Sequence, residues 1–191
     1  MVIVARKVVK WVSLVLAGVF FLFVLYELPP VQKLRYPMPY KLIVQQQANR
    51  FGVDPLLVTA VIREESRFMP KSESSAGARG VMQLMPDTAE WAAEKMGLKN
   101  YSKDQLYEPE TNIMLGSWYL ANLSKQFNNN LVLVLASYNG GRGRVQEWLS
   151  KGDISPQGQI DEIPIKETRE YVKKVLYSYN KYKELYPETN P

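Results

Sequence analysis

The sequence contains no cysteine and no histidine. Without cysteine, the chain has no disulfide, no zinc–thiolate site, no thiol nucleophile and no lipid-anchored cysteine. Without histidine, it has no Ser-His-Asp triad and no histidine-based metal site. Any acid–base chemistry must therefore use aspartate, glutamate, lysine or tyrosine, and we expect neither a metal nor another cofactor.

Length and charge narrow the class of protein further. A chain of 191 residues is long enough for one sizeable domain that buries its own core. The net charge of +5 suits an anionic partner such as cell-wall polymer, nucleic acid or lipid head groups. We do not expect nucleic acid as the partner, because no aromatic-basic signature accompanies the charge.

An uncharged apolar run from Trp11 to Tyr26 dominates the N-terminal region, and the basic residues Arg6, Lys7 and Lys10 precede it. With its apolar neighbours, this run just reaches the roughly 20 residues that a membrane-spanning helix needs. A cleaved signal peptide would show the same basic start and apolar centre. Residues 27–32 contain no cleavage site of small residues, which favours an uncleaved anchor.

The sequence predicts three parts: a membrane anchor at 1–28, a short linker stiffened by proline at 29–38, and one domain at 39–191. Basic residues flank the apolar run on both sides, but those at its N-terminal side lie closer to it. This asymmetry favours a cytoplasmic N-terminus. We therefore expect a single-pass protein of the cell membrane whose domain lies outside the cytoplasm.

From residue 39 onward the pattern is typical of a mostly α-helical domain with little or no sheet. Helices are predicted at 40–50, 55–66, 87–97, 109–127, 131–138, 145–149 and 166–186. Asp54 and Pro55 form a strong start signal, as N-cap and first helical residue. Asp87 and Glu90 fit a capping box at the start of another helix.

The most unusual stretch is 61–86. It begins as the end of a helix, continues as a loop of Ser, Gly and Ala, and ends with an apolar Met-Gln-Leu-Met run before Pro86. A carboxylate at a helix end beside such a thin loop is a plausible acid site. Glu64 and Glu65 both fall on the apolar side of the helix, so periodicity does not choose between them.

Four segments in this order carry a family resemblance: Glu65-Ser66, then 74–83, 136–141 and 163–172. Together they resemble the signature of the soluble-type lytic transglycosylases, which cleave peptidoglycan and have a lysozyme-like fold. Two positions depart mildly from the pattern, Val81 in place of Leu and Ser137 in place of Ala. The resemblance implies a lysozyme-like catalytic domain and a membrane-anchored peptidoglycan lytic transglycosylase.

The resemblance also selects Glu65, because the family places its acid directly before Ser. It implies that Glu65 acts first as acid and then as base on the MurNAc-GlcNAc β-1,4 bond. The muramic acid 6-hydroxyl is then the nucleophile, and the product is a 1,6-anhydro sugar. Burial beside apolar side chains would keep this carboxyl group protonated near neutral pH. We expect Glu73, the other nearby carboxylate, to be structural or solvated.

Substrate-binding roles carry over by position to seven residues: Ser74, Gln83, Met85, Tyr138, Asn139, Glu167 and Tyr171. Several have plainer alternatives: Ser74 as a turn residue, Met85 and Tyr138 as core residues, and Glu167 as a helix-capping residue. If Tyr138 is functional, its hydroxyl is expected to orient Glu65. The implied partners are peptidoglycan glycan strands and, through the N-terminal helix, the membrane; protein partners stay undefined.

Two other functions fit much of the same sequence. The first is a hydrolase of the lysozyme type, which would use water in place of the sugar hydroxyl. The second is a non-catalytic protein that binds or organises the cell wall. The product of the reaction distinguishes the first alternative, and the effect of replacing Glu65 distinguishes the second.

Overall fold

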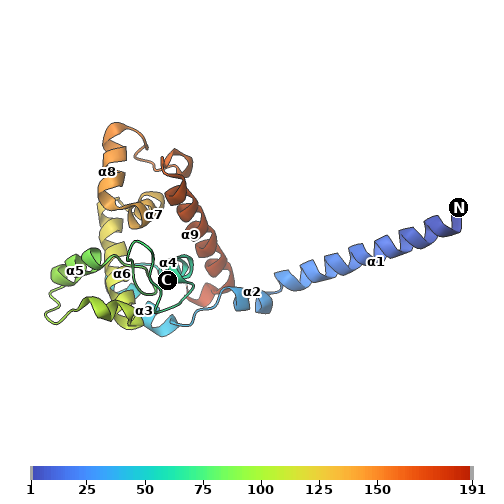
Figure 1. The fold of residues 1–191 in the computed structure, drawn as a ribbon, viewed down its shortest axis with the longest axis horizontal. Helices are drawn as coiled ribbons and strands as arrows, with labels where there is room; N and C mark the ends of the chain where they lie inside the picture. Colours follow the sequence, from blue (N-terminus) through green and yellow to red (C-terminus); the bar gives the residue numbers. More distant parts are fainter. Residues whose placement is uncertain (1, 190–191) are drawn as a thin grey trace. The chain divides into compact units, whose positions relative to one another are not determined.

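The computed structural model describes residues 2–189, and side chains from residue 10 onward (Figure 1). The chain forms two compact units, Met1–Pro37 and Met38–Pro191. Unit 1 contains α1 (Val2–Glu27) and α2 (Pro29–Arg35). Unit 2 contains α3 (Lys41–Phe51), α4 (Pro55–Ser66), α5 (Pro86–Lys95), η1 (Lys103–Tyr107), α6 (Pro109–Gln126), α7 (Leu131–Gly140), α8 (Arg142–Lys151), η2 (Ile160–Glu162), α9 (Lys166–Leu185) and η3 (Pro187–Thr189).

The described residues form no sheet. Only two isolated antiparallel bridges occur, from Glu73 to Arg79 and from Arg79 to Leu84. These observations confirm the predicted mostly helical fold.

Unit 1 contains one helix that is long and apolar enough to cross a membrane. The candidate span in α1 is Lys10–Glu27, with a mean hydropathy of 1.7 and no side chain buried within the protein. Within the predicted linker at 29–38, residues Pro29–Arg35 are helical. Both prolines stand at the first positions of α2, where a missing N–H costs no hydrogen bond. Gln32 Nε2 also donates to the carbonyl oxygen of Tyr26 at 2.9 Å.

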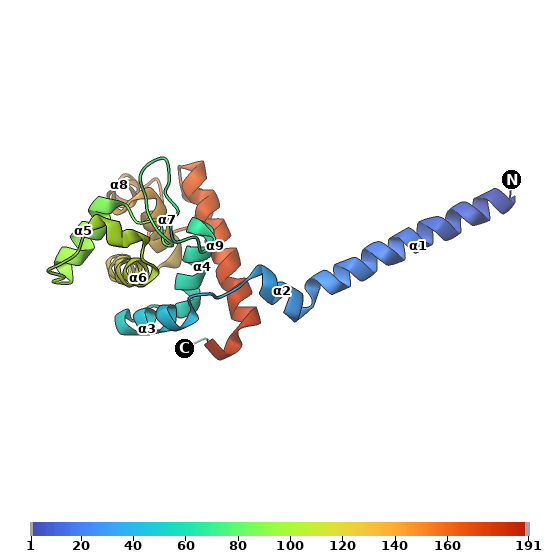
Figure 2. The ribbon, with the colours of Figure 1, turned by 60° about the horizontal axis from the view of Figure 1, so that its bottom comes forward.

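Helix α4 lies at the centre of unit 2. The side chain of Asp54 accepts a hydrogen bond from the backbone N–H of Leu56 at 2.7 Å, so the predicted start of this helix is confirmed. Every residue from Pro55 to Ile62 is buried. Figure 2 shows α4 alongside α9, and it also packs against α3. The buried helix therefore carries its C-terminal residues, Glu64 and Glu65, into the domain.

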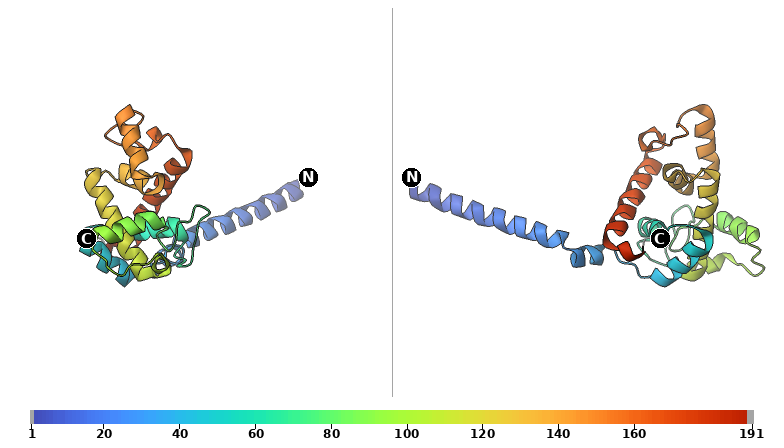
Figure 3. Two further views of the ribbon diagram at one scale, coloured as in Figure 1. Left: turned by 60° about the vertical axis from the view of Figure 1, so that its left-hand side comes forward. Right: turned by 180° about the vertical axis from the view of Figure 1, so that it is seen from behind.

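Helix α7 is the second apolar element of the core. Its residues Leu133–Ser137 are buried, and it packs against α6, α8 and α9. Figure 3 shows α7 between α8 and α9 in both views. The apolar run at 131–138 is therefore a buried helix, as predicted.

The capping box predicted at Asp87 was wrong. Helix α5 begins one residue earlier, at Pro86, and its N-cap is Met85, which makes no side-chain cap. The fixed φ of proline already suits the first helical position, so the start moves there. Asp87 instead lies exposed in the first turn and pairs with Lys103 at 3.5 Å.

One buried amide side chain, that of Asn112 in α6, forms hydrogen bonds that fix the loop between α4 and α5. Its Oδ1 accepts from the backbone N–H of Met82 at 2.7 Å, and its Nδ2 donates to the carbonyls of Arg79 and Leu106 at 2.9 Å each. Gly80 has a φ of 78°, and any side chain there would collide with Leu106 and Asn112. Gly80 of the 74–83 segment is therefore required, because only a residue without a side chain can lie this close to Leu106 and Asn112.

Asn112→Ala should destabilise the domain by about 3 kcal/mol, because it removes the partner of two buried backbone groups, the N–H of Met82 and the carbonyl of Leu106. The carbonyl of Arg79 keeps the N–H of Leu84. The measurement is urea unfolding of the full chain in detergent, followed by circular dichroism. Asn122→Ala on the same helix is the control and should change stability by less than about 0.5 kcal/mol. Equal effects of the two substitutions would contradict the role given to Asn112.

Candidate active site

The two adjacent glutamates at the end of α4 have different surroundings. Glu64 Oε1 accepts from Arg63 Nη1 and from Ser178 Oγ of α9, at 2.6 Å each. The side chain of Glu64 is only 12% exposed, so this ion pair is shielded from water. Glu64 therefore ties α4 to α9, a task that leaves its carboxylate occupied.

Glu65 is partly buried and lacks such an ion pair among the described residues. Loss of water around its carboxyl group raises the pKa of Glu65 from 4.5 to about 7. The hydroxyl of Tyr171 lowers this pKa, and the neighbouring negative charge of Glu64 raises it, both by less than burial does. At neutral pH a substantial fraction of Glu65 is therefore still protonated.

Tyr171 of α9 is the hydroxyl group that faces Glu65. This hydroxyl is buried and affects the pKa of Glu65, yet it does not reach the geometry of an ordinary hydrogen bond. Burial, followed by the nearby charge of Glu65, raises the pKa of Tyr171 well above 10. Tyr171 thus stays a neutral donor, placed to stabilise the carboxylate form of Glu65.

Tyr138 of α7 lies near the same carboxyl group but uses its hydroxyl elsewhere. The hydroxyl donates to the carbonyl of Met82 at 2.8 Å, and so joins α7 to the loop before α5. Burial raises the pKa of Tyr138 well above 10, and the charge of Glu65 raises it further. Tyr138 is therefore not the hydroxyl that faces the acid, contrary to its expected orienting role.

A cavity of about 260 Å³ lies next to Tyr138. Its lining consists of Gln83, Leu84, Met85, Thr88, Tyr119, Tyr138, Asn139, Gly140 and Gly141. Four predicted substrate-binding residues meet there, from two segments far apart in the sequence. Glu65 does not line this cavity itself, but Tyr138 lines it and lies near enough to Glu65 for the charge of Glu65 to raise the pKa of Tyr138.

Five residues of this lining were not predicted as site residues: Leu84, Thr88, Tyr119, Gly140 and Gly141. Leu84 and the pair Gly140 and Gly141 adjoin predicted site residues, whereas Thr88 and Tyr119 do not. Thr88 lies one helical turn after Met85, in the first turn of α5, so its spacing was a usable signal. Tyr119 of α6 packs on Tyr138 with ring centroids 5.6 Å apart. Nothing in the sequence around Tyr119 indicates this contact, because α6 and α7 meet only in the folded chain.

Gln83 and Met85 differ in how free their side chains are. Gln83 has a φ of 46°, and its Nε2 donates to the carbonyls of Ser72 and Gly80 at 3.0 and 2.9 Å. Its amide nitrogen is therefore used to shape the loop and not to reach Glu65. Met85 is 43% exposed, so it can offer an apolar surface to a ligand in the cavity.

Ser74 and Glu167 lie outside this cavity lining. Ser74 Oγ accepts from the backbone N–H of Ala78 at 3.0 Å, which is the turn role named as its alternative. Glu167 is exposed in the first turn of α9. Substrate contacts of these two residues stay predictions.

Glu73 has the structural role that was expected of it. It pairs with Arg79 at 3.5 Å and accepts a hydrogen bond from the hydroxyl of Tyr107, which lowers its pKa more than the charge of Arg79 does. In the part of the chain that the structure describes, no three acidic side chains are grouped to hold a metal ion.

Comparison with known proteins identifies the family to which the chain belongs. Residues 43–158 match the family model described as "Transglycosylase SLT domain". Because the match covers more than half of the chain, the chain belongs to this family. The domain has the lysozyme-like fold. The chain is similar to lytic transglycosylase Slt from Pseudomonas aeruginosa, solved as an inactive Glu-to-Gln mutant, with a TM-score of 0.75 and 37% identity over 83% of this chain and 26% of that one.

Two curated relatives show the same similarity. The soluble lytic murein transglycosylase of Escherichia coli (strain K12) is 39% identical over 151 residues, which are 78% of this chain and 23% of the relative. The membrane-bound lytic murein transglycosylase F of Desulfosudis oleivorans is 32% identical over 152 residues, 73% of this chain and 32% of the relative. The chain thus spans about a quarter to a third of the length of these relatives.

The raised pKa of Glu65 predicts a pH-dependent stability. Between pH 4.5 and about 7 the folded protein holds a proton that the unfolded chain releases, so stability falls as pH rises through this range. Glu65→Gln removes this effect and should be more stable than the wild type at pH 8 by roughly 3 kcal/mol, at about 1.4 kcal/mol per pKa unit. The difference should be small at pH 4.

Urea unfolding of the full chain in detergent, repeated from pH 4 to pH 8, measures this difference. Glu64→Gln is the control, and it should not stabilise the protein at pH 8, because it removes an ion pair. A constant difference between Glu65→Gln and the wild type across this pH range would refute the raised pKa.

Proposed function

We propose that this protein is a membrane-anchored peptidoglycan lytic transglycosylase in which Glu65 alone serves as acid and base. The observation that carries the proposal is a carboxyl group with a pKa of about 7, at the family's acid position, beside a cavity lined by family residues. A similar lytic transglycosylase is inactive as a Glu-to-Gln mutant, which supports a single essential glutamate.

The reaction begins with protonated Glu65 donating its proton to the oxygen between MurNAc and GlcNAc. The bond from that oxygen to the muramyl anomeric carbon breaks, and positive charge develops on the sugar ring. Glu65, now a carboxylate, removes the proton of the muramyl 6-hydroxyl while that oxygen bonds to the anomeric carbon. The product is 1,6-anhydroMurNAc, no water is consumed, and Glu65 is protonated again.

A pKa near neutrality suits both steps, because the group must give up a proton and then accept one. Tyr171 supports the second state, since its neutral hydroxyl stabilises the carboxylate. Gln83, Met85, Tyr138 and Asn139 would line the sugar-binding part of the cleft. Ser74, Glu167 and Tyr171 complete the proposed substrate-binding set.

The surroundings of the other carboxylates favour this reaction over hydrolysis. Glycoside hydrolases generally use two carboxylates on either side of the bond. Here Glu64 is bound by Arg63 and Ser178, and Glu73 is bound by Arg79 and Tyr107. Neither is free to activate water, so a nucleophile from the substrate itself is the simpler partner for Glu65.

Analysis of the products tests the proposed reaction. The full chain, incubated with purified peptidoglycan, should release muropeptides lighter by one water than the hydrolysis products, as measured by mass spectrometry. Glu65→Gln should reduce the rate by at least about 100-fold, the usual contribution of a general acid. Glu64→Gln should stay within a few-fold of the wild type.

Other outcomes of these measurements would contradict the proposed reaction. Reducing-end muropeptides without the loss of water would show a lysozyme-type hydrolase. Unchanged cleavage by Glu65→Gln would show that another group is the acid, and no release of muropeptides by the wild type would support the non-catalytic alternative.

Removal of residues 1–28 tests the anchor. The full chain should remain in the membrane fraction after an alkaline wash, whereas the shortened chain should become soluble. An N-terminal tag should stay attached to the full chain in the membrane. Loss of that tag would show a cleaved signal peptide and contradict the anchor.

A further inference from the structure

The cleft extends beyond the cavity beside Tyr138. A second cavity of about 200 Å³ is lined by Asp87, Thr88, Trp91, Tyr119 and Arg142. Thr88 and Tyr119 line both cavities, and Gly141 of the first directly precedes Arg142 of the second. The two cavities are therefore neighbouring parts of one surface. The second part differs from the first in carrying a guanidinium group.

Arg142 is held in place by an aromatic cluster. Its guanidinium lies 4.5 Å from the centre of the Trp91 ring. Trp91 in turn makes edge contacts with Trp118, at 5.2 Å between ring centroids, and with Tyr119, at 6.2 Å. Stacking of this kind fixes the plane of the guanidinium while leaving its N–H donors available.

The charge of Arg142 is not neutralised within the described part of the chain. No ion pair is formed by Arg142 among the described residues, and Asp87, the one carboxylate in this lining, pairs with Lys103. Arg142 is also the first residue of α8, whose N-cap Gly141 provides no side-chain acceptor for the free N–H groups. The guanidinium of Arg142 and the N-terminus of α8 therefore both favour a negatively charged ligand.

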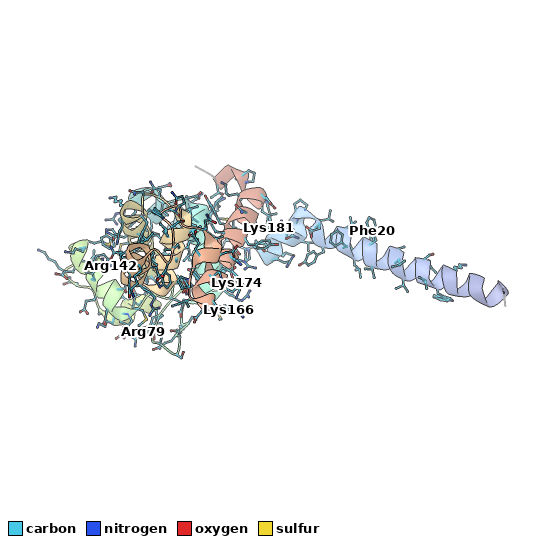
Figure 4. All side chains as sticks on the ribbon, turned by 90° about the horizontal axis from the view of Figure 1, so that it is seen from above. Phe20, Arg79, Arg142, Lys166, Lys174 and Lys181 are labelled. Carbon is cyan, nitrogen blue, oxygen red and sulfur yellow. The ribbon has the colours of Figure 1, made fainter. Side chains whose placement is uncertain are left out.

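Arg142 lies apart from the lysines of α9. Figure 4 places Arg142 beside α5, whereas Lys166 and Lys174 lie along α9. A flat array of lysines on one helix would suit a lipid surface. A single stacked arginine in an aromatic hollow next to a sugar-binding cleft instead suits one carboxylate of a bound substrate, which it can hold through two parallel hydrogen bonds.

We propose that Arg142 binds a free carboxylate of the peptide attached to a muramyl residue, and so favours strands that carry acidic peptides. This inference rests on the proposed function, because it requires peptidoglycan in the neighbouring cavity. The sugars themselves offer neutral hydroxyl and acetamido groups, and the lactyl carboxyl group is an amide where a peptide is attached. The acidic groups of such a strand therefore lie on its peptides, where a guanidinium beside the sugar cleft can meet them.

Two forms of one substrate test this assignment. Purified glycan strands with intact peptides are compared with the same strands after a carbodiimide has activated their carboxylates and excess ammonia has converted them to amides, the carbodiimide leaving as a urea. On acidic strands, Arg142→Ala should lower kcat/KM by about 5- to 10-fold, mainly through KM, as expected for a partly exposed charged hydrogen bond. On amidated strands, the wild type and Arg142→Ala should agree within about twofold.

A matched control is available on α3. Arg50 also stacks on an aromatic ring, that of Phe51 at 5.2 Å, but lines neither part of the cleft. Arg50→Ala should therefore match the wild type on both substrates. Arg142→Lys, which keeps the charge but loses the planar fork, should recover only part of the affinity for acidic strands. Circular dichroism of each variant checks that the fold is retained.

Binding to uncleaved strands separates this inference from the proposed reaction. In a Glu65→Gln background, acidic strands should bind about 5- to 10-fold more tightly than amidated ones, and Arg142→Ala should remove that preference. Equal losses on both strands, or no loss on either, would overturn the role of Arg142 while leaving the reaction untouched. Hydrolysis products with a preserved binding preference would overturn the reaction and not the role of Arg142.

Discussion

The physical constraint on which the site depends is the burial of one carboxyl group, that of Glu65, away from water. Glu65 lies at the end of a helix whose preceding residues, Pro55–Ile62, are all buried. A charged carboxylate there loses hydration that the neighbouring groups replace only in part, so the neutral form gains. The packing that stabilises α4 in the core of the domain therefore also buries Glu65, the proposed acid of the site.

Adjacent residues of identical type acquire opposite properties in this arrangement. Glu64 receives two short hydrogen bonds, one of which is an ion pair with Arg63, whereas Glu65 has only the nearby hydroxyl of Tyr171. The difference follows from a turn of about 100° along the helix, which directs one side chain toward Ser178 and the other toward Tyr171. Separate environments for two nearby carboxyl groups are a common way to set acid and base roles.

Local signals in the sequence predicted much of the fold. Asp54 and Pro55 marked the start of α4, and the apolar run at 131–138 was correctly interpreted as a helix. The family pattern selected Glu65, but the physical reason for that choice required Ser178, which is 114 residues away from Glu64. The spacing of residues in the sequence does not indicate a contact between positions so far apart.

The errors and omissions have similar causes. The prolines at 29–38 predicted a short stiff linker, but the helix that begins at Pro29 and Pro30 was not predicted. The contact of Arg142 with Trp91 joins α8 to α5, and no local pattern predicts it. The helical form of α2 also shortens the connection between the two units: seven helical residues advance about 10 Å, against about 23 Å when extended. If α1 spans a membrane as proposed, this shorter connection reduces the distance from the membrane that the catalytic domain can reach.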